Sequence, residues 1–183
     1  QRFERGQKRI EAERLRRLLE GKVLAMIELN KCRMDYLERL QEMIDEYNAG
    51  SINVETFFNK LVEFSHALGE EEQRAIAENL SEEELAVFDL LAKPDMKLTK
   101  QQEAEVKKVA KELLETLKRE KLVLDWRKRQ QSRAAVRLCI EQTLDRLPTI
   151  YSPQLFHRRC DVVYQHVYDS YLGGQQSIYS MAA

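Results

Sequence analysis

The sequence predicts an all-α protein, an irregular helical bundle of about seven helices with no sheet that begins with a long N-terminal helix. Six glycines, three prolines and 8% aromatic residues among 183 argue against a turn-rich β-sandwich or barrel. Apolar residues instead recur every three or four positions. Hydrophobic residues make up 43% of the chain, which is enough for a packed core.

Residues 7–47 are expected to form one long helix or two nearly collinear helices. The segment lacks proline, and its apolar residues repeat at helical spacing. Gly21 is its weakest point, because a glycine inside a helix costs about 1 kcal/mol relative to alanine. Residues 48–51 (NAGS) tolerate left-handed backbone and should end the helix.

Asn53 is expected to cap the next helix, over residues 54–68. Gly69 would close this helix, because glycine is the usual residue just past a helix C-terminus. A short acidic helix is then expected over residues 70–79.

Ser81 and Thr99 each stand three residues before a Glu or a Gln, which is the pattern of a capping box. Each should therefore open a helix. The first is expected to stop at residues 93–95 (KPD), and the second should run to about Glu120.

Two further helices are expected near the C-terminus. Asp125 would cap a helix over residues 126–146, and Ser152 would cap another over 154–172 with Pro153 in its first turn.

The predicted organisation has three parts. Residues 1–47 form a helical arm leading in from upstream domains that this chain lacks, because Arg2 to Glu20 already reads as the inside of a helix. Residues 48–174 form a C-terminal helical domain, and residues 175–183 form a loose tail. The predicted core comprises Phe57, Phe58, Leu61, Phe64, Leu85, Phe88, Leu91, Val109, Leu113, Leu117, Trp126, Val136 and Ile140.

Pro94-Asp95 followed by Glu105-Val106-Lys107 matches the letters of a PD…ExK nuclease site. In such a site the acids hold Mg²⁺ and the lysine polarises the attacking water. Glu105 and Lys107 lie in a predicted helix, about 200° apart around its axis, so they cannot converge. The match is therefore interpreted as chance.

His157 and Cys160 have a spacing that could offer two ligands to zinc, and His166 follows on the same helix. Cys32 and Cys139 would have to complete the site from other helices, and nothing in the sequence pairs them. No catalytic, cofactor-binding or metal-binding residue is therefore predicted in this chain.

Charge is unevenly distributed although the net charge is −1. Residues 63–89 contain nine acidic side chains against Arg74, whereas residues 118–137 contain eight basic side chains against Glu120 and Asp125. The candidate binding residues for a protein partner or DNA are Arg127, Lys128, Arg129, Arg133 and Arg137.

Arg129, Arg133 and Arg137 are spaced by four residues and would form one cationic stripe on a helix. Three interpretations remain open. The stripe could pair with the acidic residues 70–84 of the same chain, bind an acidic protein partner, or follow the phosphates of a nucleic acid.

The chain has no apolar run long enough to cross a membrane, and its three cysteines are too few and too scattered for a disulfide framework. A cytoplasmic protein without membrane contact is expected.

Three blocks of the sequence resemble the carboxy-terminal helical domain of the R (restriction) subunit of type I restriction-modification enzymes. They agree in order and spacing across about 100 residues, and the first 40 residues resemble the long helix that leads into that domain. The blocks are YNAGS at 47–51, LSEEELAVFDLL at 80–91, and LDWRK at 124–128 with RAAVR at 133–137.

The resemblance implies a parent subunit that is an ATP-dependent type I site-specific deoxyribonuclease. Its nuclease and its helicase-like motor, which use ATP and Mg²⁺, would lie upstream. This chain would be a noncatalytic accessory domain without a cofactor of its own. It would help dock the motor on the methyltransferase core of modification and specificity subunits and meet DNA through the parent complex. The alternative is a DNA-contacting module of the translocase.

Overall fold

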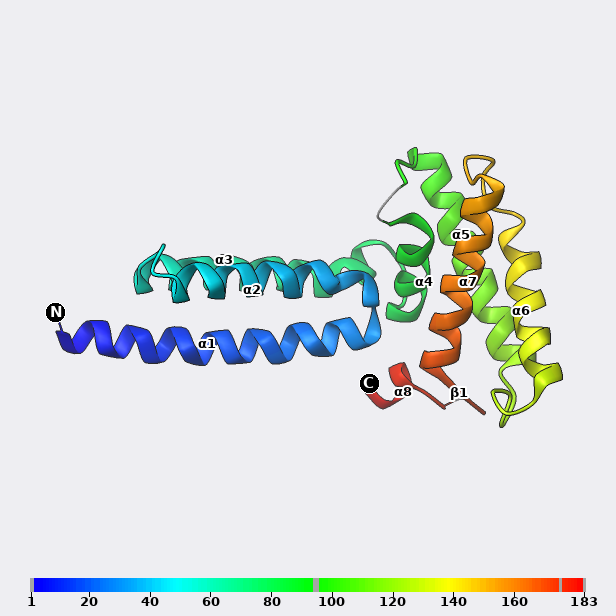
Figure 1. Ribbon diagram of the computed structural model, residues 1–183. Coiled ribbons are helices and arrows are strands. Elements are labelled where there is room, and N and C mark those ends of the chain that lie inside the picture. Colours follow the sequence, from blue (N-terminus) through cyan, green and yellow to red (C-terminus); the bar gives the residue numbers. More distant parts are fainter. Residues whose placement is uncertain (1, 94–95, 175, 183) are drawn as a thin grey trace. The chain divides into compact units, whose positions relative to one another are not determined.

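A computed structural model describes residues 2–93, 96–174 and 176–182, and within these ranges the chain is almost entirely helical (Figure 1). The predicted all-α class is confirmed. The described residues form eight α-helices, and two short strands form a ribbon that the sequence did not predict. Pro94 and Asp95, in the expected helix stop, lie outside the described residues.

The chain divides into two compact units, Gln1–Leu80 and Ser81–Ala183, called here the N-terminal and C-terminal units. This division differs from the expected segments 1–47, 48–174 and 175–183. The helix over residues 54–77 packs on the helices that precede it, so it belongs to the N-terminal unit.

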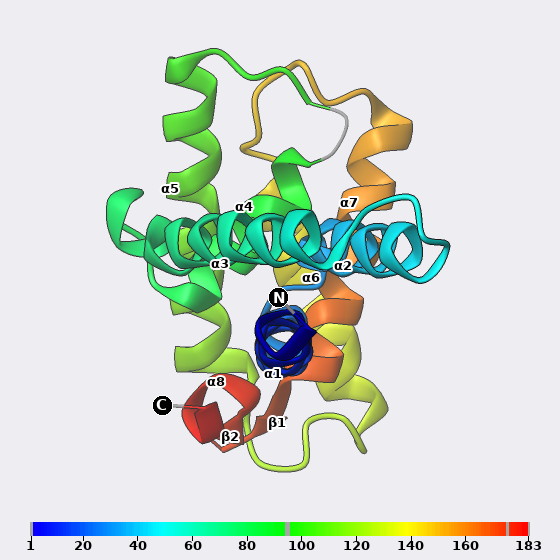
Figure 2. The ribbon, with the colours of Figure 1, turned by 90° about the vertical axis from the view of Figure 1, so that its left-hand side faces the viewer.

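The N-terminal unit is a bundle of three helices in which the chain reverses twice. Its elements are α1 (Arg2–Leu29), a 3-10 turn (Lys31–Arg33), α2 (Met34–Asn48) and α3 (Val54–Ala77). Seen along its axis, α1 lies below α2 and α3 (Figure 2).

The expected collinear helix over residues 7–47 was wrong. The chain turns back at Asn30, which is 1% exposed and whose side chain accepts a hydrogen bond from the Cys32 amide at 3.1 Å. Gly21, the expected weak point, lies inside α1. The reversal lets α1 and α2 bury their apolar faces against each other and α3, and this tertiary gain exceeds the preference for one continuous helix.

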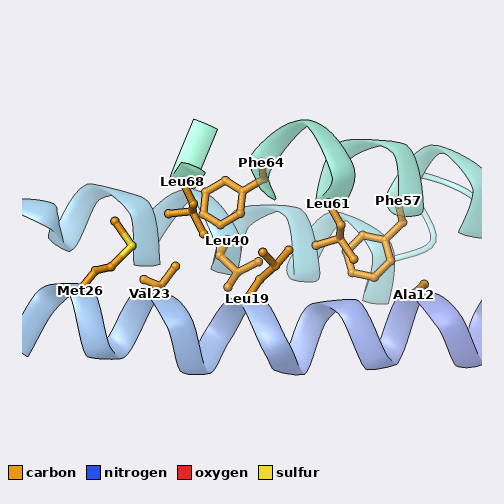
Figure 3. Packing of buried hydrophobic residues seen from close by; sticks show 9 residues of the cluster. All are labelled: Ala12, Leu19, Val23, Met26, Leu40, Phe57, Leu61, Phe64 and Leu68. Carbon is orange, nitrogen blue, oxygen red and sulfur yellow. The ribbon is translucent and has the colours of Figure 1, made fainter. Parts of the chain in front are cut away.

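The core of the N-terminal unit lies between the three helices (Figure 3). The Tyr47 ring stacks on Phe57 with 4.4 Å between centroids. Of the core residues predicted here, Phe58 is half-buried and the others are buried. The cluster comprises Ala12, Leu19, Val23, Met26, Leu40, Phe57, Leu61, Phe64 and Leu68.

Helix α3 passes through Gly69 and does not end there, so the two helices expected over 54–68 and 70–79 are one. Ala75 is buried, and its burial favours extending the helix beyond Gly69. The helix ends in a Schellman arrangement around Asn79, whose φ is 53°. The Leu80 amide donates to the Ala75 carbonyl, and the Asn79 amide donates to the Ile76 carbonyl.

The C-terminal unit is built around α4 (Glu82–Ala92), in which every residue from Leu85 to Ala92 is buried. Helix α4 packs on α5 (Lys100–Thr116) and α7 (Pro153–Ser170), and α6 (Gln130–Leu144) packs on both α5 and α7.

All four sequence-predicted N-caps outside residues 122–129 are confirmed. The side chain of Asn53 accepts a hydrogen bond from the amide of Thr56, and Ser152 accepts one from the amide of Leu155. Ser81 and Thr99 form complete capping boxes. Helix α5 passes at its C-terminal end into a π-turn over Leu117–Lys121.

Within the expected tail, residues 176–182 form a short strand and a short helix. Strand β2 (Gln176–Ser177) pairs antiparallel with β1 (Tyr171–Gly173), and α8 (Ile178–Ala182) follows. The Tyr179 hydroxyl lies 3.1 Å from Nε2 of the buried His166. This buried polar contact and the ribbon hold the segment in place.

A buried ion cluster in the N-terminal unit gives the first prediction. Arg33 Nε lies 2.8 Å from the Glu71 carboxylate, with side-chain exposures of 3% and 6%, and Arg74 also contacts Glu71. Glu71→Ala should lower the free energy of unfolding by about 3–5 kcal/mol, because it takes the carboxylate away from a buried guanidinium charge. Urea denaturation measures this.

The matched control is Glu70→Ala, one position earlier on the exposed side of α3. It should change the free energy of unfolding by less than about 0.5 kcal/mol. Equal effects of the two substitutions would contradict the structural role of the cluster.

Candidate basic surface

The candidate basic residues begin in a turn over residues 122–129, not in a helix. Asp125 was expected to cap a helix from Trp126, and this was wrong: α6 begins at Gln130, and Asp125 has a φ of 57°. Trp126 is fully buried, and its indole N–H donates to the Tyr171 carbonyl at 3.0 Å. A buried indole N–H needs an acceptor, and this one fixes the turn instead of a helix.

The ribbon residues Gly173 and Gly174 complete the support of this turn. The Gly174 amide donates to the Leu122 carbonyl at 3.1 Å. Gly173 has a φ of 103°, and a Cβ there would stand 2.6 Å from the Val123 carbonyl oxygen and 3.0 Å from the Trp126 ring. Only glycine fits this close approach.

Arg127 is tied to helix α7. Its Nη1 donates to the Tyr168 carbonyl at 3.0 Å, and its guanidinium lies 5.4 Å from the centre of the Tyr168 ring. Arg133, in the first turn of α6, donates from Nη1 to the Arg127 carbonyl at 2.6 Å. Both guanidinium groups therefore help hold the turn against α6 and α7.

Arg137 also has partners within the C-terminal unit. Its guanidinium pairs with Asp161 and with Glu141, and it lies 5.5 Å from the centre of the Tyr164 ring. The hydrogen bond to Asp161 raises the pKa of Arg137, so the side chain is a permanent cation.

Lys128 and Arg129 are the most outward members of the group. The Lys128 side chain is 79% exposed and lies 2.8 Å from Asp125, and this contact lowers the pKa of the Asp125 carboxyl. Arg129 is exposed and stands at the N-cap position of α6. Of the predicted stripe, Arg129 is thus exposed, whereas Arg133 and Arg137 bond to groups of the C-terminal unit.

The acidic stretch over residues 70–84 has other ion partners among the described residues. Glu71 pairs with Arg33 and Arg74, while Lys22 pairs with Glu72. Glu83 pairs with Lys118 and also accepts a hydrogen bond from the Tyr171 hydroxyl at 2.7 Å. Arg137 pairs with Asp161 and Glu141, which lie outside this stretch.

The structure describes only the second half of the nuclease-like motif. Pro94 and Asp95 lie outside the described residues, and Glu105 is exposed on α5. Lys107 pairs with Glu103 at 2.6 Å and lies over the Phe88 ring. The chance interpretation of this motif therefore fits the helix geometry.

The residues whose spacing could suit zinc lie in different environments. His157 is exposed, Cys160 is 3% exposed, and His166 lies between Ser170 and Tyr179. Within residues 2–93, 96–174 and 176–182, no cluster of three or more His, Cys, Asp or Glu side chains could hold a metal ion.

The sequence did not single out the aromatic and ribbon residues that support the basic group. Tyr164 and Tyr168 lie four residues apart on one face of α7, and their rings are 6.3 Å apart. The pair Gly173-Gly174 was a sequence signal that could have been used. It follows the helix expected over residues 154–172 and marks a close backbone approach.

Taken together, the fold and this surface define an all-helical protein with a basic face backed by aromatic rings. Residues 2–170 match the family of C-terminal regions of proteins like the type I restriction enzyme HindI endonuclease subunit. The chain belongs to this family, which confirms the resemblance drawn from the sequence.

A curated relative agrees with this assignment. The chain is 27% identical over 112 residues to the type I restriction enzyme HindI endonuclease subunit of Haemophilus influenzae. The match covers 61% of this chain and 10% of that protein, so the chain spans about a tenth of its relative. No solved structure matches the chain. No helix in the described part of the chain is long and apolar enough to span a membrane.

The close approach at Gly173 gives the second prediction. Gly173→Ala should destabilise the C-terminal unit by about 1–3 kcal/mol, because the methyl group meets the Val123 carbonyl and the backbone is left-handed. The fluorescence emission of Trp126, the single tryptophan, should shift to longer wavelength because its indole ring becomes more exposed to solvent. Thermal denaturation followed by fluorescence measures both effects.

Gly21→Ala is a control that should change the stability in the opposite direction. Gly21 lies in α1, and no atom stands within 4 Å of the position that an alanine methyl group would take there. Alanine should therefore stabilise the N-terminal unit by up to about 1 kcal/mol. An unchanged Trp126 spectrum in Gly173→Ala would contradict the close contact.

The cysteines give the third prediction. Burial raises the pKa of Cys160 to about 11 and also raises the pKa of Cys139, whereas Cys32 is half-buried. Only about one Cys160 in a thousand is then a thiolate at pH 8, so Cys32 should react first with a thiol reagent. Rapid modification of all three in the folded protein would contradict this burial.

Proposed function

We propose that this chain is a noncatalytic accessory domain of a type I restriction endonuclease subunit. In this role it helps dock that subunit on the methyltransferase core formed by modification and specificity subunits in the cytoplasm. The reactions that use ATP and Mg²⁺ belong to other parts of the subunit, and DNA is met through the whole complex.

The observation that carries this proposal is the bonding of three arginines, Arg127, Arg133 and Arg137, within the C-terminal unit. Arg127, Arg133 and Arg137 each bond to a carbonyl or carboxylate of the C-terminal unit. The charge of Arg137 is therefore balanced by carboxylates of the same unit, and Arg127 and Arg133 each commit an N–H group to a backbone carbonyl. This supports a docking role over a DNA track, because a DNA track depends on phosphate-neutralising cations.

Family membership supports the same role. The curated relative is itself described as an endonuclease subunit, and the matched part is a tenth of it. An all-α region of this kind, in which capping boxes close the N-termini of α4 and α5, suits an accessory part of that assembly.

The test is a full-length endonuclease subunit from which residues 81–183 have been deleted. We expect its DNA-stimulated ATPase to remain within about twofold of wild type, and its affinity for the purified methyltransferase core to fall at least tenfold. Sedimentation velocity measures the association. Undiminished association would overturn the docking role.

A salt titration distinguishes the docking role from the DNA-contacting alternative. If residues of this unit neutralise phosphates, the deletion should reduce the slope of log affinity for duplex DNA against log salt by about 0.9 for each phosphate that is no longer neutralised. We expect an unchanged slope. A reduced slope with intact docking would favour the DNA-contacting module.

A further inference from the structure

Exposed apolar side chains gather on the turn and the ribbon that supports it. We call residues 122–129 together with 171–174 the tip. Leu124 is 71% exposed, Val123 is 47% exposed, and Leu172 is 37% exposed. Leu124 also lies beside Gly174, with its Cδ1 3.4 Å from the position of a Cβ on that glycine.

These apolar groups are displayed by a rigid support. The fully buried Trp126 anchors the turn to Tyr171, and the Gly174–Leu122 hydrogen bond joins the turn to the ribbon. In β1, Tyr171 and Gly173 are buried while Leu172 between them faces outward. A surface that is already ordered loses little conformational entropy on binding.

The tip also carries cations, which lie close in sequence to the exposed Val123 and Leu124. Lys128 and Arg129 are exposed and Arg127 is half-buried, and Asp125 is the acidic residue within the tip. A partner that complements the tip therefore offers carboxylates around an apolar depression.

The composition of the tip favours a protein partner over DNA. Protein interfaces combine an apolar centre with a polar, solvent-accessible rim, whereas protein–DNA interfaces are more polar and more positively charged. The three exposed aliphatic side chains of the tip, together with its exposed cations, match the first description.

We infer that the tip inserts into an apolar depression rimmed by carboxylates on the methyltransferase core, with Leu124 and Leu172 as anchors and Lys128 and Arg129 on the rim. This inference rests on the proposed docking function and names the part of the domain that makes the contact.

The first experiment removes the apolar anchors from the full-length subunit with the variants Leu124→Ser and Leu124→Ser/Leu172→Ser. The double variant should bind the purified methyltransferase core at least tenfold more weakly, because central apolar anchors carry most of the energy of an interface. Leu138→Ser is the matched control, since Leu138 is 53% exposed on α6 outside the tip. The control should bind like wild type.

The second experiment tests the rim with Lys128→Glu. It should slow association with the core and weaken the dependence of association on salt. Lys108→Glu, on α5 with a comparable exposure of 77%, should leave both unchanged. A change in Trp126 fluorescence identifies any variant that disturbs the turn. If the double leucine variant disturbs it, the affinity of Leu124→Ser alone for the core is the measurement that tests the inference.

The outcomes distinguish a failure of the tip inference from a failure of the proposed docking function. If deletion of residues 81–183 abolishes association while the double leucine variant binds like wild type, the tip inference is wrong and the docking role stands. If the deletion has no effect on association, both are wrong. If the double variant loses affinity for duplex DNA but not for the core, the tip is a DNA-binding wedge and the protein-partner inference is overturned.

Discussion

The burial of Trp126 is the constraint on which the arrangement of the C-terminal unit depends. A fully buried indole must place its N–H on an acceptor, and the acceptor lies 45 residues along the chain at the Tyr171 carbonyl. That bond prevents α6 from starting at Trp126. It also draws the ribbon against the turn and leaves Arg127 within reach of the Tyr168 carbonyl.

Features determined by neighbouring residues could be predicted from the sequence. The capping boxes at Ser81 and Thr99, and the all-α class itself, follow from local hydrogen bonding and periodicity. The reversal at Asn30 and the continuation of α3 through Gly69 could not be predicted in this way. The reversal depends on burial of apolar side chains of α1 and α2 against α3, and the continuation of α3 brings Glu71 to the distant Arg33, so tertiary contacts override local preference at both points.

The candidate site shows the same limit. The sequence identified a dense basic group, but spacing by four residues has meaning only inside one helix, and Arg129 precedes α6. The α7 groups that engage Arg137 and Arg127 lie 24 and 41 residues further along the chain. The apolar side chains of the tip carried no periodic signal, because they lie on a turn and on a three-residue strand.

The buried contact between Arg33 and Glu71 has a mechanical consequence for the N-terminal unit. An uncompensated charge in the interior is so unfavourable that α3 cannot slide by one turn past the Asn30 reversal. The pair therefore fixes the register of the bundle, much as a single buried polar residue does in a coiled coil. Helix α1, with 28 residues, is about 42 Å long. A fixed register keeps each apolar side chain along this length opposite the same neighbours on α2 and α3.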